Sequence, residues 1–72
     1  MKLRNRIEDN CGRIHFSIQV ADPAFPNMIH FQRCVYVIYR KEEKTFHFDE
    51  PNVARRLGVT KNAVSKFIQK HI

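Results

Sequence analysis

The last 24 residues decide the fold: Asp49-Glu-Pro-Asn-Val-Ala-Arg-Arg-Leu-Gly-Val-Thr-Lys-Asn-Ala-Val-Ser-Lys-Phe-Ile-Gln-Lys-His-Ile72. Pro51 suits the first position of a helix, because no backbone donor is needed there. Asp49 or Glu50 can cap this helix and also favours the positive end of its dipole. The first part of the stretch therefore predicts a helix over about 51–57.

A second helix is expected directly after the first. Gly58 can adopt the left-handed conformation that ends a helix, and Thr60 can cap the next one. Ala54 is small enough to allow a close helix crossing, and Gly58 follows it by four residues. Apolar side chains stand where the angle between the helices must be filled: Val53, Leu57, Val59, Val64 and Phe67. We expect the second helix over about 61–71.

The run Ala-Arg-Arg-Leu-Gly-Val-Thr-Lys-Asn-Ala-Val-Ser-Lys resembles the helix-turn-helix of bacterial and phage regulators such as the Cro and repressor proteins of lambdoid phages. The resemblance covers about 20 of the 72 residues. It implies a DNA-binding helix pair whose second helix enters the major groove by its N-terminal end. Members of that family usually place another helix before the pair, whereas a β-rich segment precedes it here. An ordinary helical hairpin is the alternative.

The resemblance also implies a set of DNA contacts. Asn62 and Gln69 could pair with adenine, and Lys61 or Lys66 with guanine, by bidentate hydrogen bonds. Arg55 is expected, like Arg56, to contact phosphate. The full expected set on the second helix is Thr60, Lys61, Asn62, Ser65, Lys66 and Gln69. The alternative is that these residues form the solvated side of an amphipathic helix.

The preceding 48 residues predict a small antiparallel sheet. Apolar and polar residues alternate over 13–20, which is typical of a half-buried strand. The segment 28–40 is rich in β-branched and aromatic residues toward its end. A polar turn links it to a short strand at 45–48. With the loop that two prolines indicate between the first two strands, the chain reads as a single α+β domain over 1–72.

Residues 1–12 are interpreted as a basic arm. Lys2, Arg4 and Arg6 could lie along a DNA backbone or in a minor groove. A disordered end is the alternative reading of this segment.

The strand faces predict where the apolar side chains go. Tyr36 falls on the opposite strand face from Val35, together with Cys34 and Ile38. Such a second apolar face needs covering, by the helices on one side and a partner subunit on the other. Most of the aromatic residues are expected in the core. The alternative use is a stacking platform for single-stranded RNA.

Charge and composition limit the classes of function. Thirteen Lys and Arg against seven Asp and Glu give a net charge of +6, which favours a polyanionic partner. The sequence has no apolar run of about 20 residues and no secretory leader. Cys11 and Cys34 are therefore expected to be reduced thiols in a bacterial cytoplasm, near the nucleoid.

Neither metal binding nor catalysis is indicated by the sequence. The four histidines and two cysteines lack close ligand spacing. The chain has no Gly-rich phosphate loop, no paired carboxylates in an apolar setting and no nucleophile motif. We expect no cofactor, no metal and no enzyme activity.

The leading hypothesis is a sequence-specific regulator of transcription that binds double-stranded DNA as a homodimer on a two-fold related site. By analogy it would be a phage or mobile-element repressor or activator. The alternative hypothesis is a small protein that uses the same helices to bind a host protein and modulate its transcription machinery.

Overall fold

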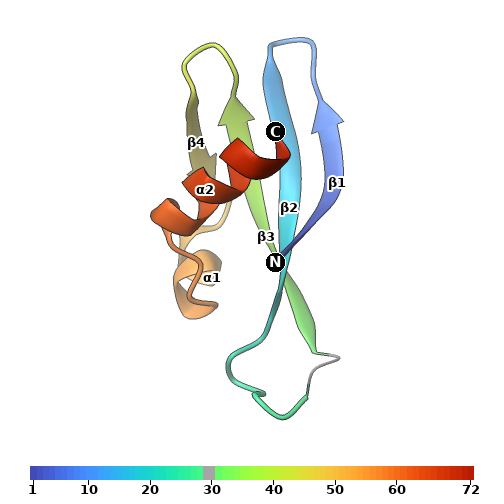
Figure 1. Ribbon diagram of the computed structural model, residues 1–72, viewed down its shortest axis with the longest axis vertical. Helices are drawn as coiled ribbons and strands as arrows, with labels where there is room; N and C mark the ends of the chain where they lie inside the picture. The colour runs from blue at the N-terminus through green and yellow to red at the C-terminus, as the bar shows by residue number, and fades with distance from the viewer. Residues whose placement is uncertain (29–30) are drawn as a thin grey trace.

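The computed structural model describes residues 1–28 and 31–72. The fold is α+β, with a four-stranded antiparallel sheet followed by two C-terminal helices (Figure 1). The sheet order β1-β2-β3-β4 follows the chain. The elements are β1 (Lys2–Glu8), β2 (Arg13–Ala21), β3 (Gln32–Arg40), β4 (Thr45–Phe48), α1 (Pro51–Arg56) and α2 (Lys61–His71).

The alternation of apolar and polar residues predicted a half-buried strand here, and β2 confirms it. Ile14, Phe16 and Ile18 are almost fully buried on one face. In the β2–β3 register, Phe16 lies beside Val37 and Ile18 beside Val35, so both strands place apolar side chains on that same face. The strand predicted over 45–48 is confirmed as β4, joined to β3 by the predicted polar turn.

The prediction of a basic arm over 1–12 was wrong. Residues 2–8 form the edge strand β1, which pairs with β2 from Lys2 opposite Gln19 to Glu8 opposite Ile14. The register shifts between Arg4 and Ile7, where Asn5 has a φ of 55°. The bulge breaks the two-residue alternation, and only Leu3 packs against the core. A strand with so little buried surface leaves a weak sequence signal.

The third expected strand is shorter than predicted. β3 begins at Gln32, whereas the sequence suggested a strand from residue 28. Residues 29–30 of that prediction lie outside the described residues. Met28 belongs to the preceding loop, since its N–H donates to the Phe25 carbonyl at 3.0 Å. The Phe25 ring stacks on Phe31 with centroids 4.6 Å apart, so local aromatic packing holds these residues in a loop.

The second helix lies where the sequence placed it, and the first ends at Arg56, one residue before the predicted end. Glu50 is the N-cap residue of α1, but its side chain makes no capping hydrogen bond. Pro51 occupies the first turn, as predicted. Gly58 has a φ of 72°, in the left-handed region that glycine favours. The Thr60 hydroxyl accepts a hydrogen bond from the Ala63 N–H at 3.2 Å and caps α2.

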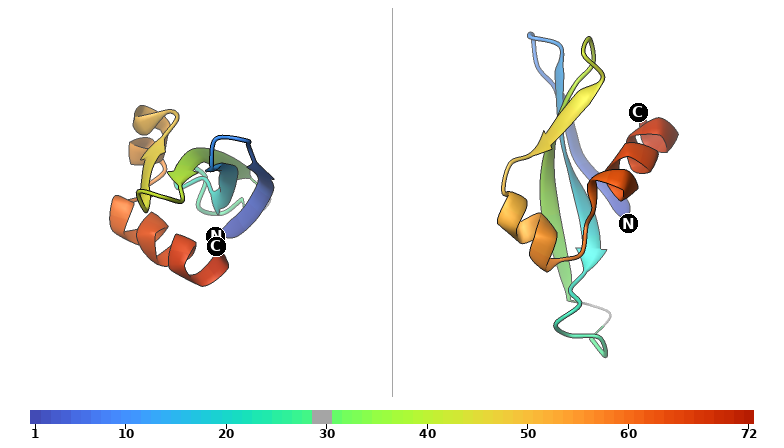
Figure 2. Two further views of the ribbon diagram at one scale, coloured as in Figure 1. Left: turned by 90° about the horizontal axis from the view of Figure 1, so that it is seen from above. Right: turned by 90° about the vertical axis from the view of Figure 1, so that its left-hand side faces the viewer.

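The two helices take different positions around the sheet. Figure 2 shows α2 lying across one face, which we call the helix face, while α1 lies beside the β4 edge. Val64, Phe67 and Ile68 of α2 are buried there, and the ring of Phe67 stacks on Phe16 at 6.3 Å. The core is thus formed between α2 and the helix face of the sheet.

The opposite face of the sheet, which we call the open face, is not crossed by α2, and α1 lies only at its β4 edge (Figure 2). By strand register it carries Arg4, Ile7, His15, Ser17, Tyr36 and Ile38. The prediction that Tyr36 and Ile38 share a second face is confirmed. None of the described helices is long and apolar enough to cross a membrane.

Candidate nucleic-acid interface

The outer side of α2 is fixed by what its inner side buries. The three buried residues, Val64, Phe67 and Ile68, are spaced three and four positions apart, so they share one side of the helix. The contacts predicted for the second helix all lie off this stripe and are exposed: Thr60, Lys61, Asn62, Ser65, Lys66 and Gln69. The fold therefore exposes this set to solvent on α2 and its N-cap.

The two arginines of α1 diverge. Arg55 is exposed and lines an open hollow of about 310 Å³ between α1, β4 and the start of α2, together with Thr60 and Lys61. Arg56 is directed at Asp22 at the end of β2, with Nη1 3.8 Å from Oδ2. Arg55 therefore lies beside residues at the start of α2, whereas Arg56 forms an ion pair with Asp22.

Asp22 is 2% exposed and organises this corner of the molecule. Its Oδ1 accepts a hydrogen bond from the Ala24 N–H at 3.0 Å. Its Oδ2 makes no hydrogen bond among the described residues, but lies 3.2 Å from Arg33 Nε and close to Arg56. A buried carboxylate is costly unless its charge is balanced. The two guanidinium groups supply that balance and tie α1 to the β2–β3 end of the sheet.

Charge is distributed unevenly between the sheet and the helices. Residues 51–72 contain five basic residues and no acidic one. Four of these five have no acidic partner within the part of the chain that the structure describes: Arg55, Lys61, Lys66 and Lys70. Arginines of the sheet are instead paired with carboxylates, such as Arg13 with Asp9 and Arg40 with Glu43. The uncompensated positive charge therefore concentrates on the helices.

One further cation joins the exposed side of α2. Lys44, at the end of the β3–β4 turn, lines a hollow with Ser65 and Gln69. Within the described chain Lys44 has no acidic partner. The sequence did not single it out, because nothing local relates residue 44 to residues 65 and 69. Only the packing of α2 across the sheet brings them together.

The residues of the predicted arm lie elsewhere. Lys2 and Arg4 are in register with Gln19 and Ser17, so they belong to the open face, away from α2. Arg4 Nε donates to Gln19 Oε1 at 2.8 Å. Arg6 pairs with Glu8 at 3.9 Å. The fold does not bring these three cations together with those of the helices.

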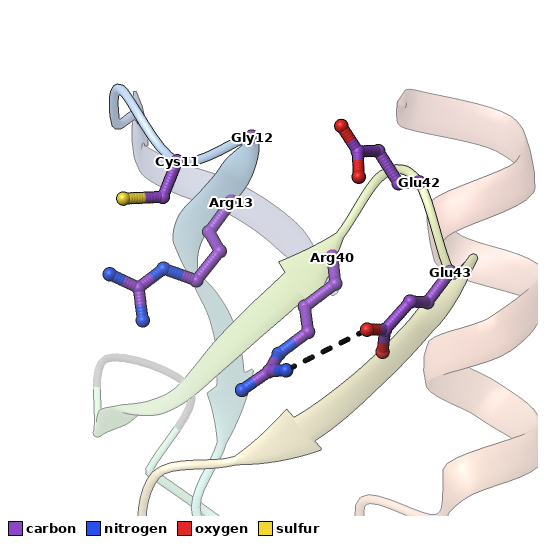
Figure 3. A pocket seen from close by; sticks show the side chains of 6 residues that line it. All are labelled: Cys11, Gly12, Arg13, Arg40, Glu42 and Glu43. Carbon is purple, nitrogen blue, oxygen red and sulfur yellow. Dashed lines mark ion pairs between the residues drawn. The ribbon is translucent and has the colours of Figure 1, made fainter.

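A third hollow lies at the far end of the sheet, between the β1–β2 and β3–β4 turns (Figure 3). The thiol of Cys11 and the guanidinium groups of Arg13 and Arg40 project around it, and a carboxylate balances each arginine. Its charge is therefore mixed. Cys11 and Cys34 are both free thiols.

Asp9 holds the β1–β2 turn together. Its carboxylate accepts hydrogen bonds from His15 Nε2 at 2.9 Å and from the backbone N–H groups of Arg13 and Cys11 at 3.0 and 2.8 Å. The His15 bond and then these backbone bonds hold the pKa of Asp9 well below its usual range. The Lys41 ammonium likewise lowers the pKa of Glu8. The contacts of Asp9 therefore fix the conformation of the β1–β2 turn, and Glu8 is paired with Lys41 beside it.

The described residues contain no group of three or more His, Cys, Asp or Glu side chains that could hold a metal ion. Comparisons with protein families, with curated proteins and with solved structures found no match for this chain.

Proposed function

We propose that the protein is a sequence-specific regulator that binds double-stranded DNA, with α1 and α2 acting as a helix-turn-helix and α2 as the helix that enters the major groove. The observation that carries the proposal is the exposed polar side of α2. Its residues combine hydrogen-bonding groups suited to base edges with cations suited to phosphate.

The charge pattern supports the same partner. Phosphate contacts supply much of the affinity of DNA-binding proteins, and each one releases counterions. The helices offer four cations without an acidic partner in the described chain, whereas the sheet uses most of its arginines internally. If all four contact phosphate, log Kd should change with log salt concentration with a slope of magnitude roughly 3 to 4.

The experiment is selection of binding sites from a random duplex library with the purified protein, followed by fluorescence anisotropy on the enriched site. We expect one enriched sequence. Asn62→Ala and Lys66→Ala should each weaken binding to the enriched site about tenfold, within the usual range for a lost base contact.

Lys2→Gln is the matched control, because it removes a charge from the open face. It should leave the preference for the enriched site unchanged. Equal affinity for all duplexes, or unchanged binding in both α2 variants, would refute the proposal.

A further inference from the structure

The open face of the sheet combines protruding apolar side chains with an apolar hollow. Ile7 is 64% exposed and Tyr36 is 52% exposed. Between their strands lies Ser17, which is fully buried: its hydroxyl donates to the Arg4 carbonyl at 3.3 Å and accepts from Asn5 Nδ2 at 3.4 Å. A hollow of about 300 Å³ lies here, and its lining includes Asn5, Ile7, His15, Ser17, Tyr36, Ile38 and Asp49.

The chain as a whole exposes more surface than a compact monomer of its mass. The chain exposes 5334 Å², whereas a compact monomer of its 8.6 kDa exposes about 4,700 Å². The excess of roughly 600 Å² approaches the ~800 Å² that each partner buries in a standard interface. The four strands, of seven, nine, nine and four residues, span a face on the order of 450 Å².

One row of the open face is complementary to itself. Arg4 is in register with Ser17, and Ser17 with Tyr36, while the Asp49 N–H donates to the Tyr36 carbonyl at 3.0 Å. One row across the sheet therefore reads Arg4, Ser17, Tyr36, Asp49. A two-fold axis parallel to the strands, between β2 and β3, reverses this row in a second copy. Each Tyr36 then lies over the other copy's Ser17, and each Arg4 faces the other copy's Asp49. The same axis would bring Arg13 and Arg40 together, but each of them is already paired with a carboxylate.

The charges at the two ends of the row favour this pairing. Among the described residues, Arg4 has a neutral partner, Gln19, and no acidic one. Asp49 makes no ion pair there either. We propose that the open face is the interface of a homodimer packed sheet against sheet, in which Tyr36 fills the partner's hollow and Arg4 pairs with the partner's Asp49. This interface does not depend on DNA binding.

The first test is sedimentation equilibrium of the full chain without DNA. The wild-type protein should be dimeric at micromolar concentration. Tyr36→Ser should weaken the dimer about tenfold or more, because buried aromatic side chains often dominate interfaces. Met28→Ser is the matched control, since Met28 is 48% exposed but lies in the β2–β3 loop. It should leave the dimer unchanged, and circular dichroism should show that both variants are folded.

Charge reversal provides the second test. Arg4→Asp and Asp49→Arg should each weaken the dimer, and the double variant should restore it by reversing the pair. A wild-type monomer throughout the concentration range, a dimer insensitive to Tyr36→Ser, or a double variant no better than the single ones would overturn the proposal. A monomer that instead binds an acidic protein through Tyr36 would overturn it too. Failure to bind DNA would leave these measurements unaffected.

Discussion

Arg55 and Arg56 are neighbours in the chain, yet the fold gives them different surroundings. The Arg56 guanidinium reaches the buried carboxylate of Asp22 at 3.8 Å, while Arg55 has no acidic partner among the described residues and lines the same hollow as Thr60 and Lys61. One arginine helps to attach α1 to the sheet. The other is available to an anionic partner.

This contrast predicts that Arg55→Ala affects DNA binding, whereas Arg56→Ala affects the stability of the fold. Arg55→Ala should weaken DNA binding several-fold and reduce the salt slope by about 0.9, the effect of one lost phosphate contact. Arg56→Ala should lower the free energy of unfolding by at most about 1 kcal/mol, because the pair is largely exposed on the arginine side. Anisotropy titrations at several salt concentrations and urea denaturation measure the two effects. Equal effects of both variants in both assays would contradict the assignment.

At the scale of elements, the start of α2 depends on one hydroxyl. The Thr60 side chain accepts the Ala63 N–H, which would otherwise have no partner in the first turn. Thr60→Ala should therefore cost about 1 kcal/mol of unfolding free energy, whereas Thr60→Ser should retain most of the cap. Urea denaturation of the two variants checks this. A serine variant as unstable as the alanine variant would show that the methyl group matters instead.

The β1–β2 turn should respond to acid through Asp9. Because folding lowers the pKa of this carboxyl group, the ionised form stabilises the fold above the ordinary pKa of about 3.9. That contribution is lost as the pH falls from there through the lowered pKa of the folded state. The difference in unfolding free energy between wild type and Asp9→Asn should shrink as the pH falls below about 4.

Urea denaturation at each pH measures this difference. Glu42→Gln, in the other turn, is a suitable control, since the structure gives Glu42 no ion pair among the described residues. A difference that stays constant down to the acid limit would show that the Asp9 contacts do not form in solution.

The elements also show what the sequence could and could not predict. β2, β4 and both helices were predictable, because alternation, Pro51, Gly58 and the Thr60 cap are local signals. β1 was missed because a bulge at Asn5 interrupts its alternation. The exposed set on α2 followed from helical spacing. The position of Lys44 beside α2 and the attachment of α1 to Asp22 could not be predicted, because these contacts join segments far apart in the chain.

At the scale of the whole molecule, α2 covers the hydrophobic core on the helix face of the sheet. Phe67 is 5% exposed and stacks on Phe16 of the sheet. Phe67→Ala should cost about 3–5 kcal/mol, which is much of the roughly 5–15 kcal/mol available to a small domain. Phe67→Leu should cost less. Ile72→Ala, at a residue that is 38% exposed, is the control and should have little effect in the same denaturation assay. A loss below 1 kcal/mol for Phe67→Ala would mean that α2 does not hold the core together.

The position of α2 across one face of the sheet has a consequence for how two copies would act together. In each copy α2 lies on the face of the sheet away from the open face (Figure 2), so when the open faces meet, the exposed sides of the two α2 helices face away from each other. Such a dimer cannot place both α2 helices in neighbouring major grooves on one side of a straight duplex. Such a dimer would instead bind two separate DNA segments, one through the α2 helix of each copy. The DNA between two distant sites would then form a loop. Regulation would then depend on the spacing of sites along the DNA as well as on the affinity for each one.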